Sequence, residues 1–91
     1  MNKLNKSSGS ITINFFLDIT EDVCPMTFVK TKLLIEKMHP GQVAEVRLKG
    51  SEPLENVPRS VMDYGHDVIS LKAEDVNQLK NSVHRLILKK N

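Results

Sequence analysis

Four short stretches of the chain carry the apolar patterns that are typical of β-strands. Ile11–Leu17 is β-branched and aromatic, and Val43–Leu48 alternates apolar with polar residues. His66–Lys72 and Val83–Lys89 show the same kinds of pattern. Because turn-forming residues separate these stretches from their neighbours, we expect four strands.

Two helices are expected between the strands. The first begins at Pro25, whose missing N–H is no loss at a helix start, and runs to Met38 before a His-Pro-Gly breaker. The second is expected to begin near Pro58, after a separate turn, and to stop at Gly65. The connection Ala73–Ser82 is polar, with room for one helical turn. Helical spacing places one set of residues on the core face of the first helix: Phe28, Thr31, Leu34, Ile35 and Met38.

The resulting order, β-α-β-α-β-β, predicts an α/β two-layer sandwich. Each helix between two strands indicates a crossover connection, and the last two strands indicate a hairpin. We therefore expect a four-stranded mixed sheet with two helices on one face. Residues 11–90 are expected to form a single domain, and the polar residues 1–10 a disordered tail.

Composition narrows the class of protein. The 91 residues carry a net charge of only +2, with three Phe, one Tyr and no Trp, which disfavours a nucleic-acid partner. No 18-residue apolar run is present, so we expect no membrane partner. A single cysteine excludes an internal disulfide and indicates a reducing, cytoplasmic location.

That cysteine, Cys24, stands where the first helix is expected to start. With Cys24 at the N-cap and Pro25 as the first helical residue, unpaired backbone N–H groups and the helix dipole favour the thiolate. Glu21 and Asp22 act in the opposite direction, because nearby carboxylates disfavour a second negative charge. We expect an accessible, reactive thiol with a pKa modestly below the ordinary value of about 8.5. The alternative is that Cys24 is a small buried hydrophobic residue.

A lone reactive cysteine restricts the chemistry. Without a second cysteine there is no dithiol exchange, and no Ser, His and Asp occur at a spacing that indicates hydrolysis. One thiol is sufficient to carry a sulfur atom as a persulfide and to hand it to another thiol.

Several short motifs in fixed order resemble the TusA/SirA-type sulfur-carrier family over about residues 15–89. They are Leu17-Asp18 at a strand end, Cys24-Pro25, Pro40-Gly41, Val57-Pro58 and Gly65-His66. The resemblance implies the same sandwich and a persulfide relay through Cys24, positioned by Pro25. It implies a sulfurtransferase-type carrier without a cofactor or a full turnover site. Thr27 stands where many members of the family have a second proline.

The resemblance also implies protein partners. A sulfur donor such as a cysteine desulfurase or a rhodanese-like protein would load Cys24, and an acceptor sulfurtransferase would unload it. Met26, Val29 and Leu33 form a second apolar stripe on the first helix, which we expect to dock a partner. Packing of this stripe in the core is the alternative.

Arg59 is expected to open the second helix near Cys24 and to support its thiolate, although an exposed arginine is the simpler interpretation. His39, His66 and His84 lack the spacing of metal ligands, so we expect no metal site. Two other functions remain open on the residues alone. One is a non-catalytic regulatory or interaction module with a structural cysteine, and the other is a small RNA-associated domain.

Overall fold

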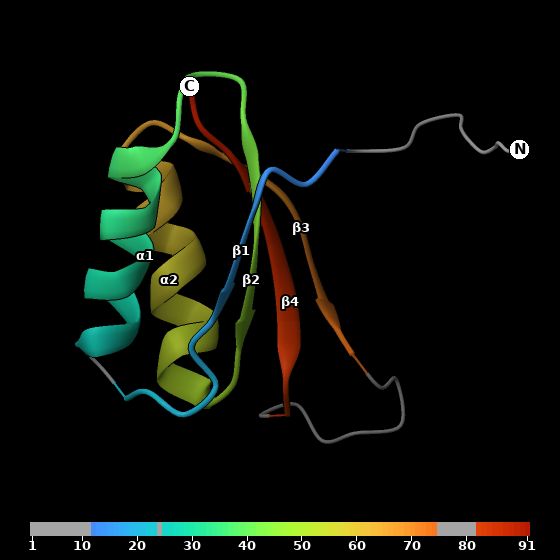
Figure 1. The fold of residues 1–91 in the computed structure, drawn as a ribbon. Coiled ribbons are helices and arrows are strands. Elements are labelled where there is room, and N and C mark those ends of the chain that lie inside the picture. The colour runs from blue at the N-terminus through green and yellow to red at the C-terminus, as the bar shows by residue number, and fades with distance from the viewer. Residues whose placement is uncertain (1–11, 24, 75–81) are drawn as a thin grey trace, which may run out of the picture.

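A computed structural model describes residues 12–23, 25–74 and 82–91 of the chain (Figure 1). The expected tail lies outside the described residues, as does most of the polar connection before the last strand. The predicted order of elements is confirmed. The strands and helices are β1 (Phe15–Asp18), α1 (Met26–Lys37), β2 (Val43–Leu48), α2 (Ser51–Asp63), β3 (Asp67–Ala73) and β4 (His84–Lys89).

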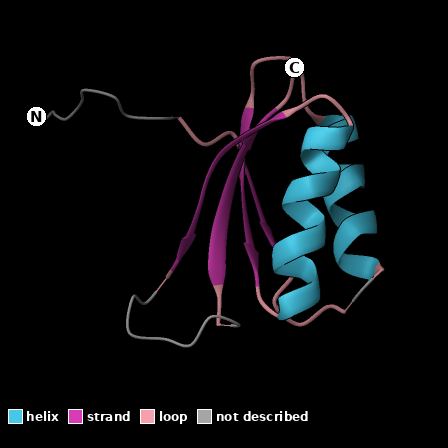
Figure 2. Ribbon diagram, turned by 180° about the vertical axis from the view of Figure 1, so that it is seen from behind, coloured by secondary structure: helices cyan, strands magenta, loops and turns pink. Residues whose placement is uncertain are grey.

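The strands form one mixed sheet in the order β1-β2-β4-β3. β1 pairs with β2 in parallel, whereas β4 pairs with both β2 and β3 in antiparallel fashion. Both helices cover the same face and leave the other face open (Figures 1 and 2). The predicted two-layer sandwich is therefore confirmed, including the antiparallel pairing of the last two strands.

The core lies between the two central strands and the helices. Alternate residues of β2 and β4 point toward the helices, and side chains of α1, α2 and the segment after β1 meet them. The fully buried strand residues are Ala44, Val46, Leu48, Leu86 and Leu88. Packed against them are Ile19, Ile35, Met38, Val57 and Val61.

The expected core face of α1 is confirmed in part. Thr31, Ile35 and Met38 are buried, and Leu34 is partly buried against the core. Thr27 is fully buried as well, and its carbonyl accepts a hydrogen bond of 2.8 Å from the Thr31 hydroxyl. The position where many family members carry proline is thus an interior position, although Thr27 was not among the residues expected on the core face.

The second helix begins earlier than predicted. It starts at Ser51, and Pro58 lies inside it and not at its beginning. Pro58 is buried beside Val57 and Val61, so apolar burial offsets the backbone hydrogen bond that proline cannot donate. The predicted stop at Gly65 agrees with the structure, where this residue has φ of +90°.

Two backbone hydrogen bonds close the end of α2. The N–H of Gly65 donates to the Met62 carbonyl at 2.9 Å, and the N–H of His66 donates to the Val61 carbonyl at 3.1 Å. This pair of bonds is the Schellman arrangement, which needs a residue with positive φ, and glycine adopts that conformation without strain. None of the described helices is long and apolar enough to cross a membrane.

The alternation in β4 predicts very different costs for truncating two adjacent residues. Leu86→Ala should lower the free energy of unfolding by about 2–5 kcal/mol, because Leu86 is fully buried between sheet and helices. Ile87→Ala, on the open face, should cost about 1 kcal/mol or less. Urea unfolding of the two variants beside the parent measures both values. Equal losses would contradict the assignment of the two faces.

Candidate functional site

Cys24 itself lies outside the described residues, so the site is built from what surrounds it in the chain. The segment from Ile19 to Pro25, which contains Cys24, connects β1 to α1 at one end of the molecule. The carboxyl ends of β1 and β2 and the amino ends of both helices share this end, at the bottom of Figure 1. The described residues before and after Cys24 in the chain therefore connect directly to β1 and α1.

The beginning of the loop is tightly held. The Asp18 carboxylate accepts hydrogen bonds from the Thr20 backbone N–H at 3.0 Å and from the Thr20 hydroxyl at 2.7 Å. Ile19, between them, is fully buried, and its N–H donates to the Arg47 carbonyl at 2.9 Å. This local turn fixes the direction in which the chain leaves β1.

The end of the loop is fixed by an ion pair. Lys30 Nζ lies 3.0 Å from each carboxylate oxygen of Asp22. Asp22 precedes α1 and Lys30 lies on it, so the pair connects the loop to the second turn of the helix. Of the two carboxylates expected to disfavour the thiolate, Asp22 therefore has a cation beside it. Glu21 has no ion pair among the described residues.

The start of α1 differs by one residue from the prediction. Pro25, predicted as the first helical residue, is the N-cap, and the helix begins at Met26. The Met26 N–H donates to the Val23 carbonyl at 2.8 Å, a three-residue bond that makes this turn tighter than an α-helix. This N–H is therefore not available to a thiol. No acidic side chain lies in the first turn, so the positive end of the helix dipole keeps its effect there.

The second apolar stripe of α1 is exposed, as predicted. Met26, Val29 and Leu33 have 44%, 37% and 52% of their surface accessible. Packing of the stripe in the core, the alternative, is excluded in this structure. Val23, just before Cys24 in the chain, is 73% exposed and adds to the same region. We call Met26, Val29 and Leu33 the α1 apolar row.

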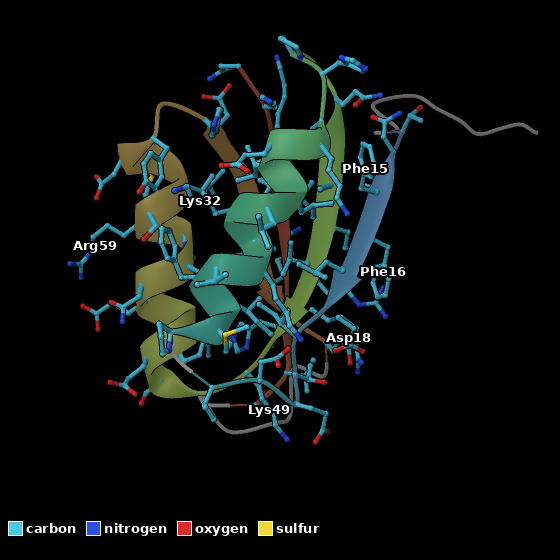
Figure 3. The ribbon with its side chains drawn as sticks, turned by 60° about the vertical axis from the view of Figure 1, so that its left-hand side comes forward. Phe15, Phe16, Asp18, Lys32, Lys49 and Arg59 are labelled. Carbon is cyan, nitrogen blue, oxygen red and sulfur yellow. The ribbon has the colours of Figure 1, made fainter. Side chains whose placement is uncertain are left out.

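Arg59 does not take the place expected of it. Because α2 begins at Ser51, Arg59 lies in its third turn and not at its start. The side chain pairs with Glu55 one turn earlier, at 2.7 Å, and projects into solvent away from Asp18 (Figure 3). The prediction that it opens the helix is wrong, and the simpler interpretation of an exposed arginine agrees with the structure.

An ion network on the open face of the sheet also holds the loop, and the sequence patterns did not indicate it. Arg47 on β2 binds Asp18 at 2.7 Å and Glu74 at 2.6 Å, and Arg85 on β4 binds Glu74 and Glu45 at 2.8 Å. We call these five residues the open-face network. It ties the carboxyl end of β1, where the loop begins, to the central strands.

The network perturbs its own carboxylates. Hydrogen bonds from Thr20, together with Arg47, lower the pKa of Asp18 to about 2. Arg47 and Arg85 likewise lower the pKa of Glu74 to about 2. In return, the hydrogen bonds from Arg47 to Glu74 and Asp18 raise the pKa of that guanidinium. Asp18, Glu74 and Arg47 therefore remain charged across the pH range in which thiol chemistry occurs.

The remaining candidate side chains of the described residues, the histidines among them, do not form a metal site. Among the described residues, no group of three or more His, Asp or Glu side chains is arranged to hold a metal ion. A groove of about 170 Å³ lies between the two helices, where the rings of Phe28 and Tyr64 stack 6.0 Å apart. Lys32 lies 5.8 Å from the Tyr64 ring centre. Phe28, Tyr64 and Lys32 pack the two helices together. None of them carries a thiol for exchange with Cys24.

Comparison with known proteins places this arrangement in a family. Residues 15–90 match the family model described as "Sulfurtransferase TusA". An Archaeoglobus fulgidus protein named "Putative sulfur carrier protein" is 42% identical over 65 residues, which cover 71% of this chain and 74% of that protein. A Methanocaldococcus jannaschii protein of the same description is 34% identical over 74 residues, covering 81% of this chain and 91% of the relative.

A solved structure shares the fold. The crystal structure of a SirA-like protein from Desulfitobacterium hafniense superposes with a TM-score of 0.67 at 18% identity. The match covers 82% of this chain and 95% of that one. The likeness at this identity concerns the fold and agrees with the two-layer sandwich described above.

The open-face network predicts how stability changes in acid. Because the pKa of Glu74 is about 2 in the folded state against an ordinary value of 4.5, its ionisation stabilises the fold above about pH 4.5. This contribution is lost as the pH falls from about 4.5 toward about 2. Glu74→Gln should therefore melt at a lower temperature than the parent at neutral pH, with the difference shrinking over that window.

The matched control is Asp67→Asn at the start of β3, which removes an exposed carboxylate that lies outside the helices and has no ion pair among the described residues. Its melting temperature should follow the parent at every pH. A parent and Glu74→Gln that differ by the same amount at pH 2 and pH 7 would show that ionisation of Glu74 does not stabilise the fold.

Proposed function

This chain belongs to the TusA sulfurtransferase family, and on that basis we propose that it is a sulfur carrier that relays sulfur as a persulfide on Cys24. The observation that carries the proposal is the match of residues 15–90 to the family model, within which the only cysteine directly precedes the N-cap of α1. The described residues on both sides, Val23 and Pro25, are exposed, which favours a thiol that a partner reaches.

The proposed reaction is an exchange between sulfur atoms. The Cys24 thiolate attacks the terminal sulfur of a donor persulfide, R–S–SH. A new sulfur–sulfur bond forms as the donor's bond breaks, and the donor leaves as a thiolate. The same exchange in the next step passes the terminal sulfur to an acceptor thiol. Neither step needs an external oxidant or reductant, because the sulfur–sulfur bond is conserved.

The electrostatics near the loop support a thiolate at neutral pH. The amino end of α1 carries a partial positive charge and has no acidic residue in its first turn. Lys30 compensates the Asp22 carboxylate, so Glu21 is the acid of the segment Ile19–Val23 that has no ion pair among the described residues. We expect the pKa of the Cys24 thiol to lie modestly below about 8.5.

A sulfur carrier of this family acts between proteins. The proposed donor is a cysteine desulfurase or a rhodanese-like protein, the proposed acceptor is another sulfurtransferase, and the proposed location is the cytoplasm. A persulfide has to pass directly between two thiols, so the surface beside Cys24 has to fit the partner. The α1 apolar row is the exposed apolar surface that follows Cys24 in the chain.

Sulfur loading tests the central proposal. After incubation with a cysteine desulfurase and cysteine, intact mass spectrometry should show a species heavier by one sulfur atom. Cys24→Ser should show none. The variant should melt within about 2 °C of the parent, because a serine fits a position next to a helix start. No adduct on the parent with several donors would count against the carrier, and a large loss of stability in Cys24→Ser would favour a structural cysteine.

Partner docking generates a second prediction. Replacing Met26 by Gln and Val29 by Thr should slow transfer to an acceptor protein about tenfold, which corresponds to the loss of one good interface anchor. Transfer to dithiothreitol should not change, since a small thiol contacts no docking surface. The melting temperature should stay near that of the parent, because both side chains are exposed.

The control is Met62→Gln on α2, where a methionine at least as exposed as Met26 lies outside the α1 apolar row. It should transfer sulfur at the parent's rate. If all three proteins transfer to the acceptor equally fast, the partner binds another surface.

A further inference from the structure

One ion pair brackets Cys24 in the chain. Asp22 precedes the cysteine by two residues, and Lys30 follows it by six. The two carboxylate oxygens of Asp22 are equidistant from Lys30 Nζ, at 3.0 Å. The Asp22 side chain is 22% exposed and that of Lys30 43%, so the pair is partly shielded from water. It closes a ring of nine residues that contains the cysteine.

The charges around this end of the molecule make Lys30 distinctive. Asp18, at the beginning of the loop, forms an ion pair with Arg47. Glu74 and Arg85, also at this end of the sheet, belong to the open-face network. The remaining charged side chains here are Glu21 in the loop, Lys49 after β2 and Glu52 in the first turn of α2. None of them has an ion pair among the described residues. Within those residues, Lys30 is thus the one cation paired with an acid of the segment Ile19–Val23.

We infer that Lys30 is a positioning residue for Cys24, which holds the segment before the cysteine against α1 and cancels the charge of the Asp22 carboxylate. The inference rests on the proposed function, because it concerns the reactivity of the same thiol. Two physical effects follow. The loop between β1 and α1 is fixed at both ends, by Asp18 and by Asp22. In addition, Glu21 is left as the one carboxylate of the segment Ile19–Val23 without an ion pair among the described residues, so less negative charge in this segment opposes ionisation of the thiol.

A set of variants separates these effects from a general loss of charge. Lys30→Met keeps the aliphatic stem but leaves Asp22 unpaired, so the pH midpoint of Cys24 alkylation should rise by about half a unit. The alkylation rate at pH 7 should then fall about threefold. Lys30→Arg keeps the charge and should stay near the parent. Asp22→Asn combined with Lys30→Met removes both charges and should return the midpoint toward the parent value.

The matched control is Lys37→Met, at the other end of α1, where the lysine is exposed and has no ion pair among the described residues. It removes the same charge and should leave the midpoint unchanged. A Lys30→Met midpoint equal to that of the parent or of Lys37→Met would overturn the inference, as would a double variant whose midpoint stays as high as that of Lys30→Met. A melting curve for each variant confirms that the comparison is made on folded protein.

Alkylation and sulfur loading are measured on the same set, so the two proposals fail in different ways. If the parent never accepts sulfur but Lys30→Met shifts the alkylation midpoint, the carrier function fails and the role of Lys30 in thiol reactivity stands. If the parent accepts sulfur and the midpoint does not move, the carrier function stands and the role of Lys30 is refuted.

Discussion

Burial of the two central strands on a single face is the constraint on which the rest of this structure depends. β2 and β4 each direct alternate apolar residues toward α1 and α2, and those residues are fully buried. A chain of this size has enough apolar surface for one such layer. The opposite face must then remain compatible with water, and the open-face network occupies it. The same layer fixes both helices with their amino ends at one end of the sheet, beside the loop that carries Cys24 (Figure 1).

Much of this architecture is readable from the sequence, because it depends on local periodicity. The strand Val43–Leu48 was predicted to the residue, and α1 to within one residue at each end. The start of α2 was not, because Pro58 is a helix breaker by local rules and only its burial in the core compensates for it. The order of strands is likewise a tertiary property. Nothing in the pattern of β4 indicates that it lies between β2 and β3.

In the candidate site, too, the features set by local spacing were predicted and those set by the assembled fold were not. The exposed α1 apolar row follows from helical spacing and was predicted, whereas the place of Arg59 was wrong because it depended on the start of α2. The ion pairs were not predicted at all. Arg47 reaches Glu74 across 27 positions of sequence, so the pair exists only once β2 and the end of β3 are assembled. Lys30 and Asp22 are eight positions apart, with a turn between them that no periodicity describes.

The place of β4 between β2 and β3 has a consequence for how the chain folds during synthesis. β3 pairs with β4 alone, and β4 follows it in the chain. As the polypeptide leaves the ribosome, β3 therefore emerges without a strand to pair with, while one edge of β2 is still unpaired. The contacts that complete the sheet join residues about 40 positions apart, which is the kind of non-local pairing that slows folding. Until β4 has been synthesised, the nascent domain exposes unpaired strand edges. Chaperones, or other copies of the same chain, bind such edges before β4 pairs with them.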